Sequence, residues 1–499
     1  MPEDNCPILV GCGQAIQREV SDLAEAKGPI DLMLEAAVEA ERDTGAKILA
    51  RADRVHVVRF LSGTYDDPAR LLAARIGSSA KDVDVTKTGG NSPQRLINET
   101  AEILANGGCS LAVLAGAETL GSFLGAMQRG IMPKWLERDG AQANVSNVDF
   151  ERTAEHETPY ELQRPINVYP LFENALRAHY GRGVDAHRRA LGELFAPFSA
   201  IAAENPYAWF REKRTAAQIS EVGPDNRYIG FPYTKYMNAI IRVDQAAAVV
   251  MTTVKTAREL GINESRWVYL HGCADVQDHW FVSERPELYR SPAIRIAARE
   301  AFGMAGWDVA DVDYFDLYSC FPSAVQIARD EIGIAENDPR PLTVTGGLPY
   351  HGGPANNYVM HSVATMMNHL RENPGKKGVC TAVGWFITKN SIGLYSTDPV
   401  EGSWSRKNPS IYQAEMDALP KVTIAVEASG QASVESYTVL FGKESAEKAI
   451  VVGRLKDNRR FLATTENTPE ILDEMTRVEC VGRVGTVEHI NGRNVFRFS

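Results

Sequence analysis

Short apolar runs alternate with amphipathic segments along the first half of the chain. The apolar runs, which predict buried strands, are residues 7–15, 54–59, 110–116 and 243–252. The segments with apolar residues at helical spacing, which predict helices, are residues 29–49, 66–76 and 93–106. Strands and helices that alternate at this spacing indicate a layered α/β fold with a buried sheet.

The same alternation starts afresh at residue 266. The second set of predicted strands is residues 267–275, 313–321, 378–385 and 391–397. The second set of predicted helices is residues 291–306, 322–333 and 358–372. Two successive α/β halves of similar plan suggest an internal duplication, although no short repeat is visible.

Two regions depart from this plan. Residues 120–240 are rich in charged, aromatic and proline residues and have no long apolar strand, which predicts an insertion lying over the core. Beyond residue 400, apolar and polar residues alternate around turns such as Asn491-Gly492, which predicts a small antiparallel β-barrel or sandwich. The predicted divisions are residues 1–265 (with the insertion at about 120–240), 266–400 and 401–499.

Composition narrows the class of protein. The chain is 44% hydrophobic and 23% charged, as in ordinary soluble proteins with a large core. A net charge of −11 argues against broad binding to nucleic acid. No stretch reaches the roughly 18 apolar residues of a membrane span, and the first residues lack a signal-peptide pattern. We therefore expect a cytoplasmic protein without nucleic-acid or membrane partners.

Cysteine and histidine spacing gives no sign of a disulfide scaffold or a metal site. Seven cysteines are scattered without a CxxC pair, which is typical of a reduced cytosolic protein. The ten histidines show no HxxxH or comparable ligand spacing. We expect no bound metal and no covalently bound cofactor.

Six segments, in this order along the chain, resemble the thiolase superfamily, especially its sterol-carrier-protein-2-thiolase-like branch. They are ILVGCGQ at 8–14, TGGNSP…LAGAET at 88–119, VDQAAAVVM at 243–251, DLYSCFPSA at 316–324, GGLPYHGGPANNYVMH at 346–361 and GVCTAVGWFITKNSIG at 378–393. The resemblance covers residues 5–398. The added β-rich domain is similar to that of the monomeric proteins called thiolase-like type 1.

This resemblance implies a duplicated five-layer αβαβα core with an added C-terminal barrel. It also implies acyl-CoA thioesters as small-molecule partners, with coenzyme A as the substrate moiety. Either a monomer or a homodimer is expected. In this fold most coenzyme A contacts come from the insertion, where the many Arg and Lys residues leave the individual contacts open.

The first position of interest is the thiolase nucleophile. A thiolase holds a cysteine thiolate at a helix start, where the helix dipole lowers the pKa of the thiol. The register from the AGAE strand places this position on Gly90 or Asn91, and neither can form an acyl-enzyme. Asn91 is kept as a candidate substrate-binding residue. Cys109, at the far end of the helix, is interpreted as a buried small residue.

The second and third positions lie in DLYSCF and the glycine-rich loop. Tyr318 stands where the family has Asn or His, and it either donates to or takes a proton from a substrate or is a half-buried strand-end tyrosine. Cys320 follows as a candidate thiol. The family's loop histidine falls on Gly353, whereas this chain has His351 two residues earlier and His361 on the next helix.

The fourth position is the loop after GVC, where thiolases carry a cysteine acid/base. The register there favours Val383, with Cys380 three residues earlier and Asn390 in the following turn. The candidate catalytic residues are therefore Tyr318, His351, Cys320 and Cys380. The candidate substrate-binding residues are Asn91, Gly353, His361 and Asn390.

Three functions stay open from the sequence. The first is an acyltransferase of lipid metabolism, similar to acetyl-CoA acetyltransferase, with His351 as base and Cys320 or Cys380 as thiol; it leads because it is the common activity of the fold. The second is a retro-aldol carbon–carbon lyase on a β-hydroxyacyl-CoA. Members of the branch that lack the nucleophile use tyrosine bases and a small oligonucleotide-binding-fold partner, which Tyr318 and the fused barrel would match. The third is a non-catalytic binder of coenzyme A esters.

Overall fold

The computed structural model describes residues 3–145 and 153–499, and its largest sheet has nine strands in the order β11-β12-β13-β10-β1-β9-β5-β2-β4. The strands of the first half are β1 (Pro7–Ile16), β2 (Arg54–Val58), β4 (Asp82–Val85), β5 (Leu111–Thr119) and β9 (Asp244–Thr253). Those of the second half are β10 (Val268–Gln277), β11 (Tyr314–Asp316), β12 (Lys377–Gly384) and β13 (Lys389–Ser396). The halves join where β1 pairs with β10, at Ile8 opposite Tyr269.

The two halves repeat one pattern of strand pairing. In the first half β1 pairs antiparallel with β9, β9 antiparallel with β5, and β5 parallel with β2. In the second half β10 pairs antiparallel with β13, β13 antiparallel with β12, and β12 parallel with β11. This repetition confirms the predicted duplication of the α/β core.

Helices form the other layers of the core. Its helices are α1 (Pro29–Thr44), α2 (Pro68–Arg75), α3 (Ser92–Ala105), α9 (Val254–Glu259), α10 (Pro292–Ala305), α11 (Pro322–Ile332) and α12 (Tyr358–Glu372). Helix α1 covers β1 and β9, and α10 covers β10 and β13. Helices α3 and α12 contact each other and strands of both halves, so they form the central layer of the expected αβαβα core.

A glycine explains how closely α1 approaches its sheet. A Cβ at Gly13 would lie 2.5 Å from Ala40 N, so no larger residue fits at this position of β1. The facing stripe of α1 is apolar and buried, with Met33, Ala36, Ala37 and Ala40 fully covered. The helical spacing seen in the sequence therefore becomes the packing face of the helix.

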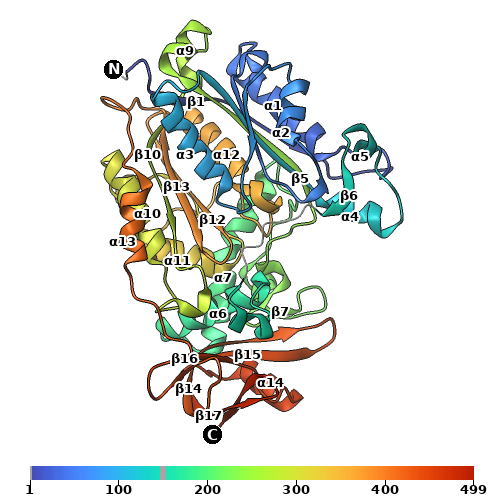
Figure 1. The fold of residues 1–499 in the computed structure, drawn as a ribbon, viewed down its shortest axis with the longest axis vertical. Coiled ribbons are helices and arrows are strands. Elements are labelled where there is room, and N and C mark those ends of the chain that lie inside the picture. Colours follow the sequence, from blue (N-terminus) through green and yellow to red (C-terminus); the bar gives the residue numbers. More distant parts are fainter. Residues whose placement is uncertain (1–2, 146–152) are drawn as a thin grey trace.

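The part of the insertion that contains α6, α7 and β7 lies between the core and the C-terminal sheet, whereas α4, α5 and β6 lie at the side of the core (Figure 1). Its helices are α4 (Leu120–Gln128), α5 (Lys134–Arg138), α6 (Pro165–His179), α7 (Val184–Glu204) and α8 (Ala216–Ser220). Its strands, which are short, are β6 (Gln142–Val145), paired with β3 (Ser62–Thr64), and the hairpin of β7 (Tyr228–Gly230) and β8 (Tyr233–Thr234). In its described part no long apolar strand occurs, as predicted.

The C-terminal region is a closed barrel. It consists of β14 (Gly430–Phe441), β15 (Ala446–Leu455), β16 (Arg460–Ala463), α14 (Pro469–Arg477), β17 (Val484–Ile490) and β18 (Arg493–Phe498). The strands pair in the order β16-β15-β14-β17-β18. Thr464 closes the ring, because its N–H donates to Asn494 O and its carbonyl accepts from Phe496 N. This connectivity is that of an oligonucleotide-binding fold.

Several predicted boundaries were wrong. The strand expected over 313–321 ends at Asp316, after which the chain leaves the sheet. Beyond residue 400 the first strand begins only at Gly430, and helices α13 (Pro409–Asp417) and α14 were missed. The domain boundaries at residues 265 and 400 stay a prediction. Within the described residues, no helix has both the length and the apolar character needed to cross a membrane.

Candidate functional site

A cavity of about 560 Å³ opens where both halves of the core meet the insertion. Most of its wall is apolar, and the wall includes Leu61, Ile166, Ile229, Ile240, Phe321 and Trp385. Its volume lies in the range of cavities that hold small organic ligands. It is therefore the candidate active site.

Gly90, one of the two residues that the register allowed for the nucleophile, lines this cavity together with the residues at the other three motif positions. Gly90 comes from the turn before α3, Tyr318 from the loop after β11, Gly353 from the glycine-rich loop and Val383 from β12. These segments are far apart in the sequence and converge because both halves place the ends of equivalent elements at one point. The motif register thus locates the cavity.

The phenol of Tyr318 fills the place of a side chain at Gly90. A Cβ built on Gly90 would lie 2.5 Å from Val383 O and closer still to Tyr318 Oη. No side chain fits there without displacing the phenol or the backbone. A cysteine nucleophile is therefore sterically excluded at position 90.

The turn before α3 is held by the glycine-rich loop. Gly89 N donates to Asn356 Oδ1 over 3.0 Å, and Asn356 Nδ2 donates to Arg59 O over 2.8 Å. Gly89 and Gly90 line the cavity directly before the first turn of α3. The partial positive charge of that helix end therefore favours negative charge at this side of the cavity.

The cavity is poor in groups that ionise near neutral pH. Burial raises the pKa of the Tyr318 phenol well above its usual range, and burial raises the pKa of the Cys320 thiol to about 12. Tyr169 Oη donates to Trp385 O over 2.7 Å, and burial raises its pKa as well. None of the described residues that line the cavity is a histidine, aspartate or glutamate. Its proton-transfer groups are phenols, one thiol and the Lys235 amine.

His351 and His361 lie in the interior and do not line the cavity. Their rings are 5.1 Å apart, and His361 Nδ1 lies 2.8 Å from Gln14 Oε1. Burial lowers the pKa of His351 to about 4 and also lowers the pKa of His361. Gly352, with φ of +111°, turns the loop so that His351 is buried while Gly353 reaches the cavity.

Cys380 is also fully buried away from the cavity. It precedes Val383 by three residues on β12, and side chains with that spacing point to opposite faces of a strand. Burial raises the pKa of the Cys380 thiol well above its usual value. Its place on the strand explains why only Val383 faces the site.

Asn91 and Asn390 line a second, polar cleft of about 340 Å³ beside the turn before α3. Asn91 Nδ2 donates to Ser391 Oγ over 3.5 Å, and Asn390 Nδ2 donates to Ile387 O over 3.0 Å. The structure therefore separates the eight candidates into three places. In the cavity are Tyr318, Cys320 and Gly353; in the polar cleft are Asn91 and Asn390; in the interior are His351, His361 and Cys380.

Sequence reasoning missed Tyr169, Lys235, Asn356 and Trp385, which also line the cavity. Asn356 stands inside the quoted GGLPYHGGPANN segment, so the motif itself pointed to it. Tyr169 and Lys235 come from the insertion, whose aromatic content was the only signal. Trp385 adopts φ of +59° just after β12, which no sequence pattern predicts.

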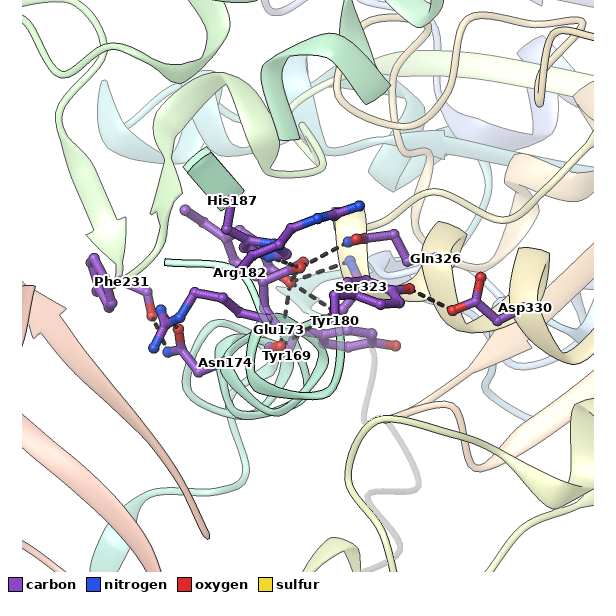
Figure 2. A network of polar contacts seen from close by, with 12 residues as sticks. Tyr169, Glu173, Asn174, Tyr180, Arg182, His187, Phe231, Ser323, Gln326 and Asp330 are labelled. Carbon is purple, nitrogen blue, oxygen red and sulfur yellow. Dashed lines mark hydrogen bonds and ion pairs between the residues drawn. The ribbon is translucent and has the colours of Figure 1, made fainter. Parts of the chain in front are cut away.

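A buried polar network surrounds Glu173, which lies one helical turn after Tyr169 on α6 (Figure 2). Glu173 is fully buried; it accepts from Tyr233 Oη over 2.7 Å and Gln326 Nε2 over 2.8 Å, and it lies 2.7 Å from His187 Nε2. These partners come from β8, α11 and α7. A carboxylate with this set of partners ties the insertion to the second half of the core.

Two sequence families match parts of the chain. The thiolase C-terminal domain-like family matches residues 274–354, and the thiolase-like protein type 1 additional C-terminal domain family matches residues 412–491. An acetyl-CoA acetyltransferase from Methanothermobacter thermautotrophicus is 24% identical over 236 residues, which cover 44% of this chain and 59% of that protein. The 17-hydroxy-3-oxo-4-pregnene-20-carboxyl-CoA lyase of Mycobacterium tuberculosis is 24% identical over 382 residues, 74% of this chain and 91% of that protein.

Solved structures show the same fold. The Ltp2-ChsH2(DUF35) aldolase aligns with a TM-score of 0.57 at 16% identity, over 79% of this chain and 98% of that one. A monomeric SCP2-thiolase-like protein type 1 from Mycobacterium smegmatis aligns with a TM-score of 0.86 at 34% identity, over 100% of both chains. With this identity over its whole length, the chain belongs to the family of SCP2-thiolase-like proteins type 1, within the thiolase superfamily.

Proposed function

We propose that the protein is a carbon–carbon lyase that cleaves a β-hydroxyacyl-CoA by a retro-aldol reaction. One observation carries the proposal: the Tyr318 phenol occupies the place where a thiolase nucleophile would project from position 90. A thioester carbonyl in this cavity would meet a neutral proton donor instead of a thiolate. The 24% identity to a carboxyl-CoA lyase over 91% of its length supports the same class of reaction.

The reaction can be written with the groups of the cavity. When the Cα–Cβ bond breaks, its electron pair moves to Cα and forms a thioester enolate. The positive end of α3 stabilises the enolate oxygen. The phenol of Tyr318 gives its proton to Cα while its oxygen takes the proton of the β-hydroxyl, so the phenol is regenerated. The products are a ketone or aldehyde and a shortened acyl-CoA.

The apolar wall supports a bulky apolar acyl group as substrate. Burial of apolar surface contributes about 25 cal/mol per Å², so a large hydrocarbon gains most from such a wall. The lyase relative is named for a pregnene derivative, which is a substrate of this class. We propose that the thioester part enters near Gly90 and the acyl part lies along Ile166, Ile229 and Phe321.

Acyl transfer through a cysteine has less support. A Cys320 thiol with a pKa of about 12 is almost fully protonated at neutral pH, and only the thiolate attacks a thioester. Cys380 and the proposed base His351 are buried outside the cavity. A rearranged nucleophile–base pair would need both residues to move into the site.

The test is a cleavage assay with a series of β-hydroxyacyl-CoA thioesters that carry apolar β-substituents. The expected products, detected by mass spectrometry, are the shortened acyl-CoA and the matching carbonyl compound. Tyr318→Phe should abolish the products while isothermal titration still shows thioester binding. Cys320→Ala, a change in the same cavity, serves as the matched control and should retain activity. Loss of activity in Cys320→Ala, with activity in Tyr318→Phe, would overturn the proposal.

A further inference from the structure

The hairpin of β7 and β8, residues 228–234, belongs both to the C-terminal barrel and to the wall of the cavity. We infer that this hairpin determines which acyl groups fit, and that the barrel holds it in place through Phe231 as a positioning residue. The substrate part of this inference rests on the proposed function, whereas the mechanical part rests on geometry alone.

The barrel side of the hairpin is fixed by its backbone. Gly230 pairs with Leu440 of β14, and Phe231 N donates to Val439 O over 2.8 Å. Phe231 O accepts from Thr438 Oγ1 of the same strand over 3.0 Å. The hairpin is thus an extra part of the barrel sheet, although almost 200 residues separate the two segments.

The Phe231 ring fixes the hairpin a second time. It is fully buried among the core residues of the barrel, with its ring 6.0 Å from that of Tyr437. The guanidinium of Arg177 lies 5.7 Å from the Phe231 ring and makes two hydrogen bonds to Glu479, of 2.8 and 2.7 Å. Since Arg177 belongs to α6, the same contact ties that helix to the barrel.

The other side of the hairpin meets the cavity. Ile229, two residues before Phe231, lines it. Tyr233, two residues after, is fully buried and stacks on Phe321 of the cavity wall with ring centres 5.5 Å apart. Tyr233 Oη also donates to Glu173 over 2.7 Å. A shift of Phe231 in the barrel would therefore move Ile229 directly and Phe321 through its contact with Tyr233.

If the barrel only added stability, any change in its core would affect the hairpin equally. Phe496 provides the matched control for this alternative. This residue of β18 is also buried in the barrel core, at 1% exposure, but it lies in a strand that does not pair with β14 or the hairpin. Phe231→Leu and Phe496→Leu remove comparable apolar contacts. Thr438→Val, which is nearly the same shape, removes only the hydrogen bond to Phe231 O and covers the case in which Phe231→Leu does not fold.

Hydrogen exchange of the full chain tests the mechanical part without any ligand. Peptides that cover residues 226–241 and 165–172 should exchange at least about tenfold faster in Phe231→Leu and Thr438→Val. Phe496→Leu should speed exchange in the barrel peptides alone. The same exchange pattern in all three variants would overturn the inference, because the hairpin would then respond only to overall stability.

Binding tests the specificity part, with butanoyl-CoA and dodecanoyl-CoA as probes in isothermal titration. Phe231→Leu and Thr438→Val should weaken dodecanoyl-CoA about tenfold and leave butanoyl-CoA unchanged, since only the long chain reaches the wall. Equal weakening of both probes, or the same change in Phe496→Leu, would contradict the inference. If the unmodified protein binds neither thioester, the proposed function fails. The hydrogen-exchange pattern then still tests whether the barrel holds the hairpin in place.

Discussion

The glycine-rich loop at 346–357 and helix α12 face two regions of the molecule that differ in chemistry. Toward the cavity the loop presents Gly353 and Asn356, beside the phenol of Tyr318. Toward the interior it presents His351, which packs against His361 of α12. The cavity has no histidine among its described lining residues, whereas the interior beside the loop has the buried His351 and His361. The position that the register assigned to the family's histidine, Gly353, therefore lies in the cavity, whereas the two candidate histidines lie in the interior.

The largest expected effect is on the cavity side. Tyr318→Phe removes the hydroxyl that lies against Gly90 and should lower turnover about 100- to 10,000-fold, the usual contribution of a general acid or base. Thioester affinity should change little, because the ring stays in place. Steady-state kinetics with a β-hydroxyacyl-CoA checks this. Turnover within tenfold of the unmodified protein would place the chemistry elsewhere.

The next largest effect is expected in the interior region around His351, and it concerns the free energy of unfolding. His351 has a pKa of about 4 when folded and about 6.5 when unfolded, so below pH 6.5 the unfolded state binds more protons. Its contribution to the free energy of unfolding is therefore present above pH 6.5 and falls by about 3 kcal/mol on acidification to pH 4. His351→Gln should remove this part of the pH dependence in urea unfolding.

His351→Gln should also leave turnover at pH 7.5 within about threefold of the unmodified protein, well below the effect of losing a general base. The control is the half-buried His369, further along α12, changed to Gln. A large loss of activity in His351→Gln alone would show that the interior region takes part in catalysis, so the chemistry would not be confined to the cavity.

A smaller effect is expected from Gly90→Ala, which crowds Tyr318 Oη and Val383 O. Overpacking of this kind costs about 1–3 kcal/mol in the free energy of unfolding. In the Tyr318→Phe background the cost should shrink, because the hydroxyl is absent, and this coupling is measured by a double-mutant cycle. Gly303→Ala, which meets open space, is the control. If Gly90→Ala lowers the free energy of unfolding equally with and without the Tyr318 hydroxyl, position 90 does not contact that hydroxyl.

The smallest effect is expected from Cys320→Ala. With the thiol pKa at about 12, alkylation by iodoacetamide should be slow at pH 7.5 and rise about tenfold per pH unit up to pH 11. Turnover should fall less than about tenfold, because the thiol transfers no proton in the proposed reaction. Fast alkylation at pH 7.5 with loss of activity would restore the acyltransferase hypothesis.

Much of the core could be predicted from the sequence because its strands and helices are strongly periodic. The α12 helix begins and ends where the apolar spacing predicts, at residues 358 and 372. Helices α13 and α14 were missed because each buries few residues, such as Tyr412 and Met416 in α13. Each is only nine residues long, which is too short for a helical period to stand out from the alternation of the neighbouring strands.

The sequence indicated which segments line the candidate cavity, but it did not indicate which side chains face it. The register allowed Gly90 or Asn91 for the first position and gave Tyr318, Gly353 and Val383 for the others, and all of these except Asn91 line the cavity. His351 and Cys380 were candidates through residue type alone. A turn at Gly352 and the alternation along β12 direct them into the interior, and neither backbone direction is legible from residue type.

In the proposed reaction Tyr318 supports carbon–carbon cleavage without an acyl-enzyme. The most direct measurement runs the cleavage of a β-hydroxyacyl-CoA in deuterium oxide and weighs both the shortened acyl-CoA and the intact protein. The proposed reaction predicts a single deuterium on Cα of the product, delivered through Tyr318, and an unchanged protein mass. A protein that gains the mass of an acyl group would contradict it.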